Sequence, residues 1–309
     1  MKPFRLAFAT TVATWILLLI GGLVNPMGAS MACPDWYFIP TCNGELLPEM
    51  TGGVLYEHGH RLWASWVGLL TLVLAFVTWR AKNVDATSKK YALSALVLVC
   101  VQGTLGGITV KLNLSSSIST LHLGTAMAFF GLLIALTFRL APASARPSVP
   151  SMHRGLILAA VAVVFAQVIL GGMVRHLGAG LICGDDWVGC GPSGWTKQPL
   201  AHLHMTHRFV AYALVPIVLL AGRHAAREAA ATGNNLAARL AKLPAVLILV
   251  QVALGLLTVA TGRSVGIVTF HTATGALVLA SLWACYLALG PSRAAGLLRD
   301  AGAREGANR

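Results

Sequence analysis

The sequence predicts an all-α integral membrane protein whose eight transmembrane helices form two parallel-repeat four-helix bundles, with both termini cytoplasmic. Three observations lead to this prediction. Only 11% of the 309 residues are charged, whereas about 25% are charged in a soluble domain. Eight apolar runs approach the roughly 20 residues that a helix needs to cross a bilayer. The second half of the chain also repeats features of the first half about 150 residues later.

The apolar runs define the expected helices, at 6–24, 58–79, 91–110, 119–138, 154–174, 204–222, 244–262 and 268–289. The first run follows Lys2 and Arg5, a pattern that is also typical of a signal peptide. Its counterpart in the repeat is the fifth run, which follows an internal linker and therefore cannot be a signal peptide. We therefore expect the first run to be a true membrane span.

Basic residues alternate between the two sides of the predicted membrane. Seventeen of the 23 Lys and Arg residues fall on one side, which holds the N-terminus, the even-numbered connections and the C-terminal tail. The other six are Arg61, Lys111, Arg175, Lys197, Arg208 and Arg263. By the positive-inside rule, the basic side is cytoplasmic, which predicts a multi-pass protein of the cell inner (cytoplasmic) membrane. The net charge of +13 therefore reflects topology, and no nucleic-acid partner is expected.

The repeat is visible as matched segments. "LLIGGLVNPMGASMAC" at 18–33 matches "VILGGMVRHLGAGLIC" at 168–183, and "VQGTLGGITV" at 101–110 matches "VQVALGLLTV" at 250–259. Because each half has an even number of helices, the halves should run in the same direction, related by a pseudo-two-fold axis along the membrane normal. The expected organisation is an N-terminal half, a cytoplasmic linker, a C-terminal half and a cytoplasmic tail, at 1–140, 141–153, 154–290 and 291–309.

Four of the ten histidines are paired by the repeat, namely His60 with His207 and His122 with His271. Each lies near the outer end of an even-numbered helix, so all four should lie at one depth. A single intramembrane histidine is usually an interhelical hydrogen-bonding residue. Two per half, on facing helices about 8–10 Å apart, indicate axial ligation of a haem iron. A zinc site would instead require three or four converging ligands.

Basic residues near these histidines are candidates for binding the haem propionates, because a guanidinium group binds carboxylates through paired hydrogen bonds. Arg61 and Arg208 directly follow a histidine of the repeat, and we expect them to bind propionates. Lys111 and Arg175 flank the outer ends of the same helices. For these two, snorkelling of a basic side chain to the membrane interface is an equally good interpretation.

Four cysteines form two pairs in predicted outer loops, Cys33 with Cys42 and Cys183 with Cys190. Outer loops face an oxidising compartment, so two disulfides within the loops are expected. Structural stabilisation is sufficient to explain Cys183–Cys190. For Cys33–Cys42 a redox role is a second interpretation, because an exposed disulfide beside a redox cofactor could exchange electrons.

The repeat fails at one acidic residue. Glu57 lies three residues before His60 and on the same helical face, whereas its counterpart in the second half is His204. This asymmetry predicts that the first half performs the chemistry and the second half holds a fixed cofactor. The alternative is a structural carboxylate paired with Arg61 or with a loop donor. His58 faces elsewhere and has no repeat partner, so no role is assigned to it.

The motifs together resemble the haem A synthase family. The resemblance covers about residues 6–289 and includes E-x-x-H-R (Glu57, His60, Arg61), "LHLGTA" with His122, "MTHRF" with His207 and "TFHTATG" with His271. The cysteine pairs are similar to those of the subgroup with disulfides in the outer loops, in which Cys33 and Cys42 would take part in electron transfer. The family oxidises the C8 methyl group of haem O to a formyl group by successive hydroxylations.

The resemblance implies a different ligand for each half. A haem b cofactor would bind in the C-terminal half between His207 and His271, with Arg208 and Arg175 nearby. The first half departs from the family pattern because Asn25 stands where Arg175 has its counterpart.

Substrate haem O would bind in the N-terminal half. His60 and His122 would hold its iron, Arg61 and Lys111 are the candidate propionate partners, and Glu57 would be the catalytic carboxylate. Further candidate partners are membrane lipid, a haem O synthase and a second copy of the chain.

Two other functions are compatible with four matched histidines. The first is a di-haem b-type membrane cytochrome that transfers electrons from quinol to an outer acceptor, although ligands that all lie at the outer end make a path across the membrane awkward. The second is a haem carrier without redox chemistry, in which the cysteine pairs would be purely structural.

Overall fold

The computed structural model describes residues 2–36, 39–142, 149–150, 152–184, 186, 188–191, 198–233 and 235–290. Within this part of the chain it contains eight helices that are long and apolar enough to cross a membrane. They are α1 (Pro3–Val24), α2 (Gly52–Arg80), α3 (Ala86–Lys111), α4 (Ser116–Leu140), α5 (Arg154–His176), α6 (Pro199–Ala231), α7 (Asn235–Ala260) and α8 (Val265–Ala288). The prediction of eight helical membrane spans is confirmed. The predicted tail, 291–309, lies outside the described residues.

Most helices extend past the apolar runs that predict them, because polar residues can continue the backbone hydrogen bonding beyond the membrane core. The clearest case is α6, which continues to Ala231 although its apolar run ends near 222. Polar residues also fix helix starts: the Asp85 carboxylate caps α3 by accepting from the Ser88 N–H. Arg139, at the end of α4, pairs with the same carboxylate at 2.7 Å.

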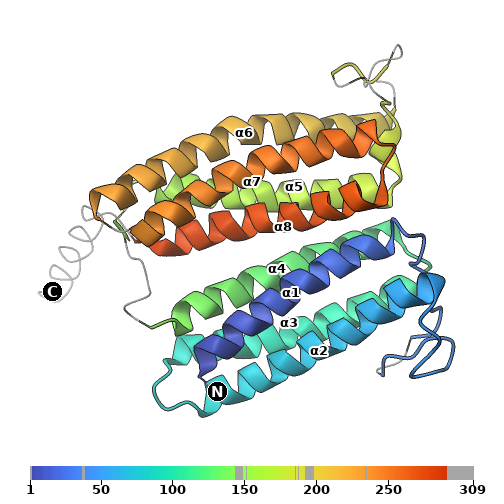
Figure 1. Ribbon diagram of the computed structural model, residues 1–309, viewed down its shortest axis with the longest axis horizontal. Coiled ribbons are helices and arrows are strands. Elements are labelled where there is room, and N and C mark those ends of the chain that lie inside the picture. The colour runs from blue at the N-terminus through green and yellow to red at the C-terminus, as the bar shows by residue number, and fades with distance from the viewer. Residues whose placement is uncertain are drawn as a thin grey trace, which may run out of the picture.

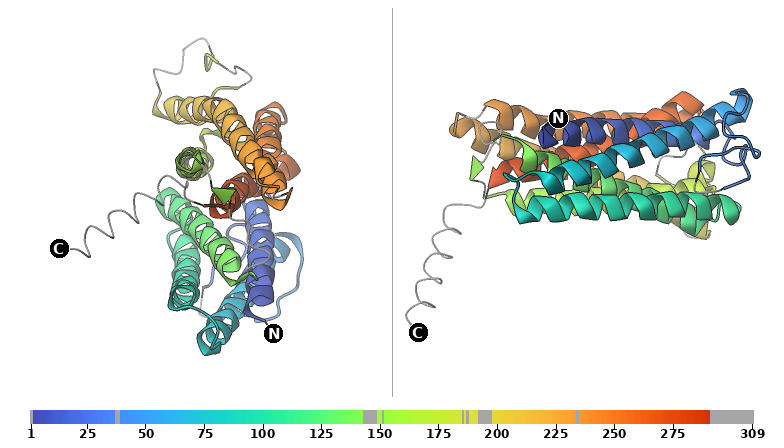
Figure 2. Two further views of the ribbon diagram at one scale, coloured as in Figure 1. Left: turned by 90° about the vertical axis from the view of Figure 1, so that its left-hand side faces the viewer. Right: turned by 90° about the horizontal axis from the view of Figure 1, so that it is seen from below.

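The helices pack in two groups of four (Figure 1). In the first group α1 and α3 each contact α2 and α4, and in the second α5 and α7 each contact α6 and α8. The groups meet through α1 with α8, α4 with α5, and α4 with α8, as the end-on view in Figure 2 shows. Two short parallel strands, β1 (Val149–Pro150) and β2 (Leu289–Gly290), pair the segment before α5 with the end of α8.

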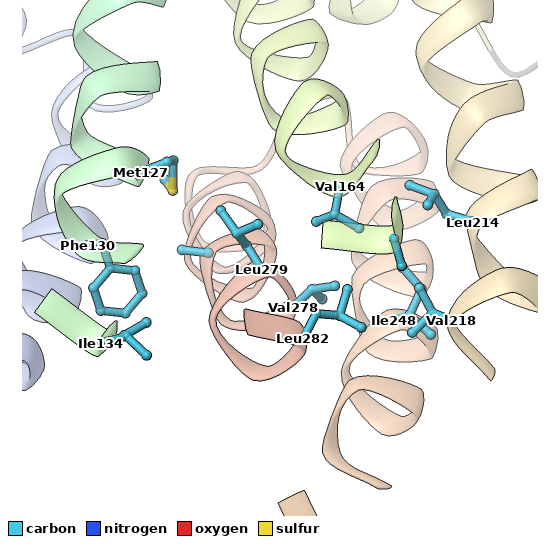
Figure 3. Close-up of a cluster of buried hydrophobic side chains, with 12 residues drawn as sticks. Met127, Phe130, Ile134, Val164, Leu214, Val218, Ile248, Val278, Leu279 and Leu282 are labelled. Carbon is cyan, nitrogen blue, oxygen red and sulfur yellow. The ribbon is translucent and has the colours of Figure 1, made fainter. Parts of the chain in front are cut away.

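A hydrophobic cluster joins the two groups. Met127, Phe130 and Ile134 of α4 face Leu279 of α8, and the cluster continues into the second group at Val164 (Figure 3). By contrast, large apolar side chains such as those of Phe76 and Val246, which are 63% and 59% exposed, lie on the outside of the molecule. So much exposed apolar surface is unfavourable in water and suits a lipid environment.

Small residues allow the groups to approach closely. A Cβ at Gly22 of α1 would lie 3.5 Å from Thr272 of α8, and a Cβ at Gly172 of α5 would lie 2.8 Å from Leu123 of α4. These two contacts connect positions that the sequence repeat also matches. Gly22 therefore lets α1 pack closely against α8, and its repeat counterpart Gly172 lets α5 pack closely against α4.

The described parts of both loops that contain a cysteine pair lie at the same end of the molecule (Figure 1). We refer to residues 25–51 as disulfide loop 1, to residues 177–198 as disulfide loop 2, and to this end as the disulfide end. The two loops contain the bonds Cys33–Cys42 and Cys183–Cys190. The expected disulfides are therefore confirmed.

The contact between α6 and α7 should be sensitive to one methyl group. A Cβ at Gly222 would lie 2.9 Å from the Ala241 carbonyl oxygen, and this backbone atom can yield only if the helices separate. We expect Gly222→Ala to cost about 1–3 kcal/mol and to lower the Tm of the detergent-solubilised protein by several degrees in scanning fluorimetry. Gly68→Ala is the matched control, since its Cβ would meet nothing within 4 Å. Equal Tm values for the two variants would contradict this packing.

Candidate functional site

The four matched histidines all pack against a glycine of the preceding helix. A Cβ on the glycine would lie 2.9–3.2 Å from the imidazole Cε1 atom in every case. The pairs are Gly21 with His60, Gly106 with His122, Gly171 with His207, and Gly255 with His271. In each pair, the missing side chain makes the space for the imidazole ring.

The structure places one pair of predicted ligands in each half. His60 of α2 and His122 of α4 belong to the first group of four helices, and His207 of α6 and His271 of α8 belong to the second. The Nδ1 atoms of His60 and His207 are buried and have no hydrogen-bond partner among the described residues. Buried polar atoms normally have partners, so these imidazoles suit a ligand that the protein atoms do not supply.

The chemistry of these pairs fits a haem better than a bare metal ion. In the described part of the chain no three His, Cys, Asp or Glu side chains converge as a metal site. In each half the two imidazoles come from helices on opposite sides of the group, α2 with α4 and α6 with α8, and not from directly packed neighbours as the sequence predicted. Two imidazoles placed in this way, each beside a bare glycine backbone, suit a haem whose iron is held by two histidines. The residues present therefore fit a haem in each half.

Sequence reasoning missed three glutamines that also contact these histidines. Gln102 Nε2 lies 3.1 Å from Nδ1 of His122 and donates to the His122 carbonyl at 3.0 Å. Gln251 Nε2 lies 3.4 Å from Nε2 of His271, and Gln167 Nε2 donates to the His207 carbonyl at 2.7 Å. Each glutamine lies four residues before the glycine that faces the same histidine. The motif Q-x-x-x-G, which occurs in three apolar helices, is the signal that could have found them.

Glu57 is buried and firmly bound in the first half. It is 5% exposed; its Oε1 accepts from Arg61 at 2.8 Å and its Oε2 accepts from the Cys33 N–H at 2.9 Å. Both contacts that the structural interpretation of this carboxylate predicted, to Arg61 and to a loop donor, are therefore present. The second contact connects the carboxylate to the backbone of Cys33, one of the two cysteines of the first disulfide.

Arg61 holds disulfide loop 1 on α2. Its terminal nitrogens donate to the carbonyls of Cys33, Asp35 and Thr41, the latter two at 2.7 Å. The Asp35 carboxylate in turn accepts from the Thr41 hydroxyl and the Asn43 N–H, both at 2.8 Å. The predicted role of Arg61 in binding a propionate stays a prediction. Its observed partners are the carbonyls of this loop and the carboxylates of Glu57 and Asp35.

Arg208 makes the corresponding contacts in the second half. It donates to the Asp186 carbonyl at 2.6 Å, and its Nε lies 3.2 Å from Nε2 of the buried His204. His204 thus occupies the place that Glu57 has in the first half. The N–H groups of Gly189, Gly191 and Val188 donate to the Asp186 carboxylate, and these hydrogen bonds hold the pKa of Asp186 below its usual range.

The remaining predicted basic residues lie at the same end. Arg175 donates from Nε to the Asn25 side chain at 3.3 Å and from Nη2 to the Gly22 carbonyl at 3.2 Å, so it connects α5 to the end of α1. Lys111 is exposed at the end of α3. The structure tests neither residue as a propionate partner.

Three further aromatic side chains lie near the predicted histidine ligands. The indole of Trp36, from disulfide loop 1, occupies the space that a Cβ at Gly107 would need. His176 lies between the halves, with Nδ1 3.0 Å from the Thr120 hydroxyl. His58, to which the sequence assigned no role, is fully buried, and neither ring nitrogen has a partner in the described part of the chain.

Disulfide loop 1 should loosen without the Arg61 guanidinium. Arg61→Gln removes donors to three loop carbonyls, and each hydrogen bond to a charged group contributes about 1.5–3 kcal/mol. We expect the backbone amides of residues 39–45 to exchange hydrogen at least about tenfold faster. Lys111→Gln is the control, since Lys111 is an exposed cation at the same end. Unchanged exchange in Arg61→Gln would show that the disulfide alone orders the loop.

Comparisons with known proteins identify the family of this chain. Residues 49–283 match the COX15-CtaA family, described as cytochrome oxidase assembly protein. The haem A synthase of Rhizorhabdus wittichii is 31% identical over 251 residues, covering 74% of this chain and 70% of the relative. Those of Halalkalibacterium halodurans and Bacillus licheniformis are 26% and 29% identical, covering 92% and 72% of this chain and 95% and 75% of the relatives. The chain therefore belongs to the haem A synthase family of cytochrome oxidase assembly proteins.

Proposed function

We propose that this protein is a haem A synthase, an oxidoreductase that converts haem O to haem A by oxidising the C8 methyl group to a formyl group in successive hydroxylations. Family membership supports the overall reaction. The observation on which the proposal depends most is the difference between two otherwise matched sites. A buried carboxylate, Glu57, lies one helical turn before His60 on α2, and a buried imidazole, His204, lies one turn before His207 on α6.

The second half is the proposed site of a resident haem b. His207 and His271 would hold its iron, because each has a bare glycine backbone beside its ring and Nδ1 of His207 has no partner in the described structure. When bound, haem b supplies one-electron transfer at its iron. Arg208 and Arg175 are the proposed propionate partners. Gly171 and Gly255 keep space beside the ligands that any larger residue would fill.

The first half is the proposed site of substrate haem O, with His60 and His122 as iron ligands and Arg61 and Lys111 as propionate partners. Glu57 is the proposed catalytic residue. Each of its oxygens accepts one hydrogen bond from the protein, and a carboxylate oxygen can accept a second. A fixed anion of this kind can stabilise positive charge at the reacting carbon or accept the proton that is released.

The Cys33–Cys42 disulfide is a candidate electron acceptor for this site. Reduction of a disulfide to two thiols takes up two electrons and two protons, which matches one hydroxylation of a methyl group by water. The Cys33 N–H donates to the catalytic carboxylate, so the disulfide and Glu57 are adjacent. Cys183–Cys190, which has no carboxylate at the corresponding place, is proposed to be structural.

The sequence repeat and the distribution of basic residues support a specific membrane topology. We propose that residues 1–140 and 154–290 are parallel halves joined by the linker 141–153, with both termini on the cytoplasmic side of the cytoplasmic membrane. The disulfide end then faces the oxidising compartment, which suits its two disulfides. Haem O synthase and a second copy of the chain are proposed partners, which would meet this protein within the same membrane.

A di-haem b-type electron-transfer cytochrome is the second candidate function. The observation that favours it is the equivalence of the four histidine–glycine contacts, which would suit two similar permanent haems. The identity of the bound haems distinguishes the two functions. A cytochrome would hold two equivalent b haems and form no haem A.

Glu57→Gln provides the test of the proposed chemistry. A glutamine retains an oxygen that can accept from the Cys33 N–H but has no negative charge, so haem b should stay bound while haem A formation falls at least about 100-fold. Haems are extracted from cells that express each variant together with a source of haem O, and are identified by chromatography. Glu45→Gln is the control, because Glu45 is an exposed carboxylate of the same loop. This variant should form as much haem A as the wild type. Undiminished haem A in Glu57→Gln would exclude the catalytic role.

A further inference from the structure

A groove with basic walls lies between α6 and α7, where α6 ends and α7 begins, at the end of the molecule opposite the disulfide end (Figure 1). Its volume is about 540 Å³. Arg223 and Arg227 of α6 and Lys242 of α7 line it together with small and apolar residues, and no acidic residue of the described chain is among the lining residues. We refer to it as the basic groove.

The basic groove follows from how α6 and α7 pack. Gly222, Ala226 and Ala230 line it from α6, and residues four apart lie on one face of a helix. The helices approach closely at Gly222, where a Cβ would lie 2.9 Å from the Ala241 carbonyl oxygen and 3.8 Å from Cβ of Ala245. No large side chain of α6 therefore fills the space beside this contact, and the groove is built into the helix pair.

The three cations of the basic groove have no partner of their own. Arg223, Arg227 and Lys242 are exposed and form no hydrogen bond or ion pair with the described residues. Glu228 follows Arg227 in the sequence but lies on another face of α6, where its carboxylate pairs with Nδ1 of His153 at 2.8 Å. The positive charge of the groove is therefore available to an anion from outside the chain.

Other arginines at this end of the molecule are already bound. Arg139 pairs with the Asp85 carboxylate at 2.7 Å. Arg154 lies over the ring of Tyr286, 4.1 Å from its centroid. The basic groove thus differs from the rest of this end in gathering three cations around a hollow without an anion.

The basic groove also crosses the boundary between polar and apolar surface. The apolar run of α6 ends immediately before Arg223, and that of α7 begins just after Lys242. These cations therefore lie at the level of lipid headgroups. Leu219 and Val246, which also line the groove, lie within the apolar runs and hence at the level of the acyl chains. A phospholipid has the same order of charged and apolar parts.

We propose that the basic groove binds an anionic phospholipid, with the phosphate between Arg223, Arg227 and Lys242 and the acyl chains along Leu219 and Val246. A guanidinium group binds a phosphate through paired hydrogen bonds, and basic pockets between transmembrane helices suit phospholipid headgroups. A free phosphate would use only the polar part of the groove. The histidine pairs lie at the other end of the helices, so this inference does not depend on the proposed function.

The test measures lipid binding to the purified full-length protein by native mass spectrometry. The probes are phosphatidylglycerol and phosphatidylcholine with identical acyl chains. The wild type should bind phosphatidylglycerol at least about tenfold more tightly, because each basic residue near an anionic headgroup contributes about fivefold. Arg223→Gln combined with Arg227→Gln should weaken phosphatidylglycerol binding at least about tenfold and leave phosphatidylcholine binding unchanged. Bound phosphatidylglycerol should also raise the Tm of the wild type more than that of this variant.

Arg80→Gln combined with Lys90→Gln is the matched control. It removes two exposed positive charges at the same end of the molecule, and Arg80 is the repeat counterpart of Arg227. This control should bind phosphatidylglycerol as the wild type does. Arg223→Lys combined with Arg227→Lys retains the charges and should lose less affinity than the glutamine pair.

Three results would overturn the proposal. Equal affinity of the wild type for the two lipids would show that the groove does not select an anionic headgroup. An equal loss of binding in the control pair would show a general attraction to surface charge. Displacement of phosphatidylglycerol by excess inorganic phosphate would show a site for a free anion.

Discussion

The contact of an imidazole ring with a bare glycine backbone is the constraint on which the rest of the structure depends. A side chain at any of the four glycines would begin within about 3 Å of a histidine ring. The contact therefore fixes how closely each odd-numbered helix approaches the even-numbered helix that follows it. It also sets the depth of each histidine. The two histidine pairs lie near the disulfide end because their glycines do, and disulfide loops 1 and 2 are held above them by Arg61 and Arg208.

Function is best understood through the places where matched positions differ. Glu57 corresponds to His204 and Leu17 to Gln167, and Trp36 packs on Gly107 where the second half has Leu256. These differences surround the first histidine pair. The first half has a buried carboxylate where the second half has an imidazole.

Much of the fold was predictable, because the length of an apolar run is itself a physical requirement of a membrane span. The disulfides were predictable because paired cysteines in loops that face an oxidising compartment form bonds. The helix ends of α6 and α7 were not, because helical hydrogen bonding continues into polar sequence. The glutamines were missed because a single uncharged amide in an apolar helix resembles ordinary packing.

The partners of Arg61 show that its position in the sequence does not determine which acceptors it binds. A guanidinium group beside a histidine suits a haem propionate, and it also suits loop carbonyls at the same end of the helix. Spacing along one helix cannot tell these acceptors apart, because the loop carbonyls that Arg61 reaches belong to residues far from it in the sequence. Glu57 does pair with Arg61, and its catalytic role remains a proposal.

The division of the two halves into a substrate site and a cofactor site is tested most directly by the haem content of four single variants. His60→Ala, His122→Ala, His207→Ala and His271→Ala are purified from cells without a haem O source, and haem b is quantified per protein. The variants at 207 and 271 should lose their resident haem b, and the variants at 60 and 122 should retain the wild-type amount. Equal loss from all four, or loss confined to the first pair, would contradict the division.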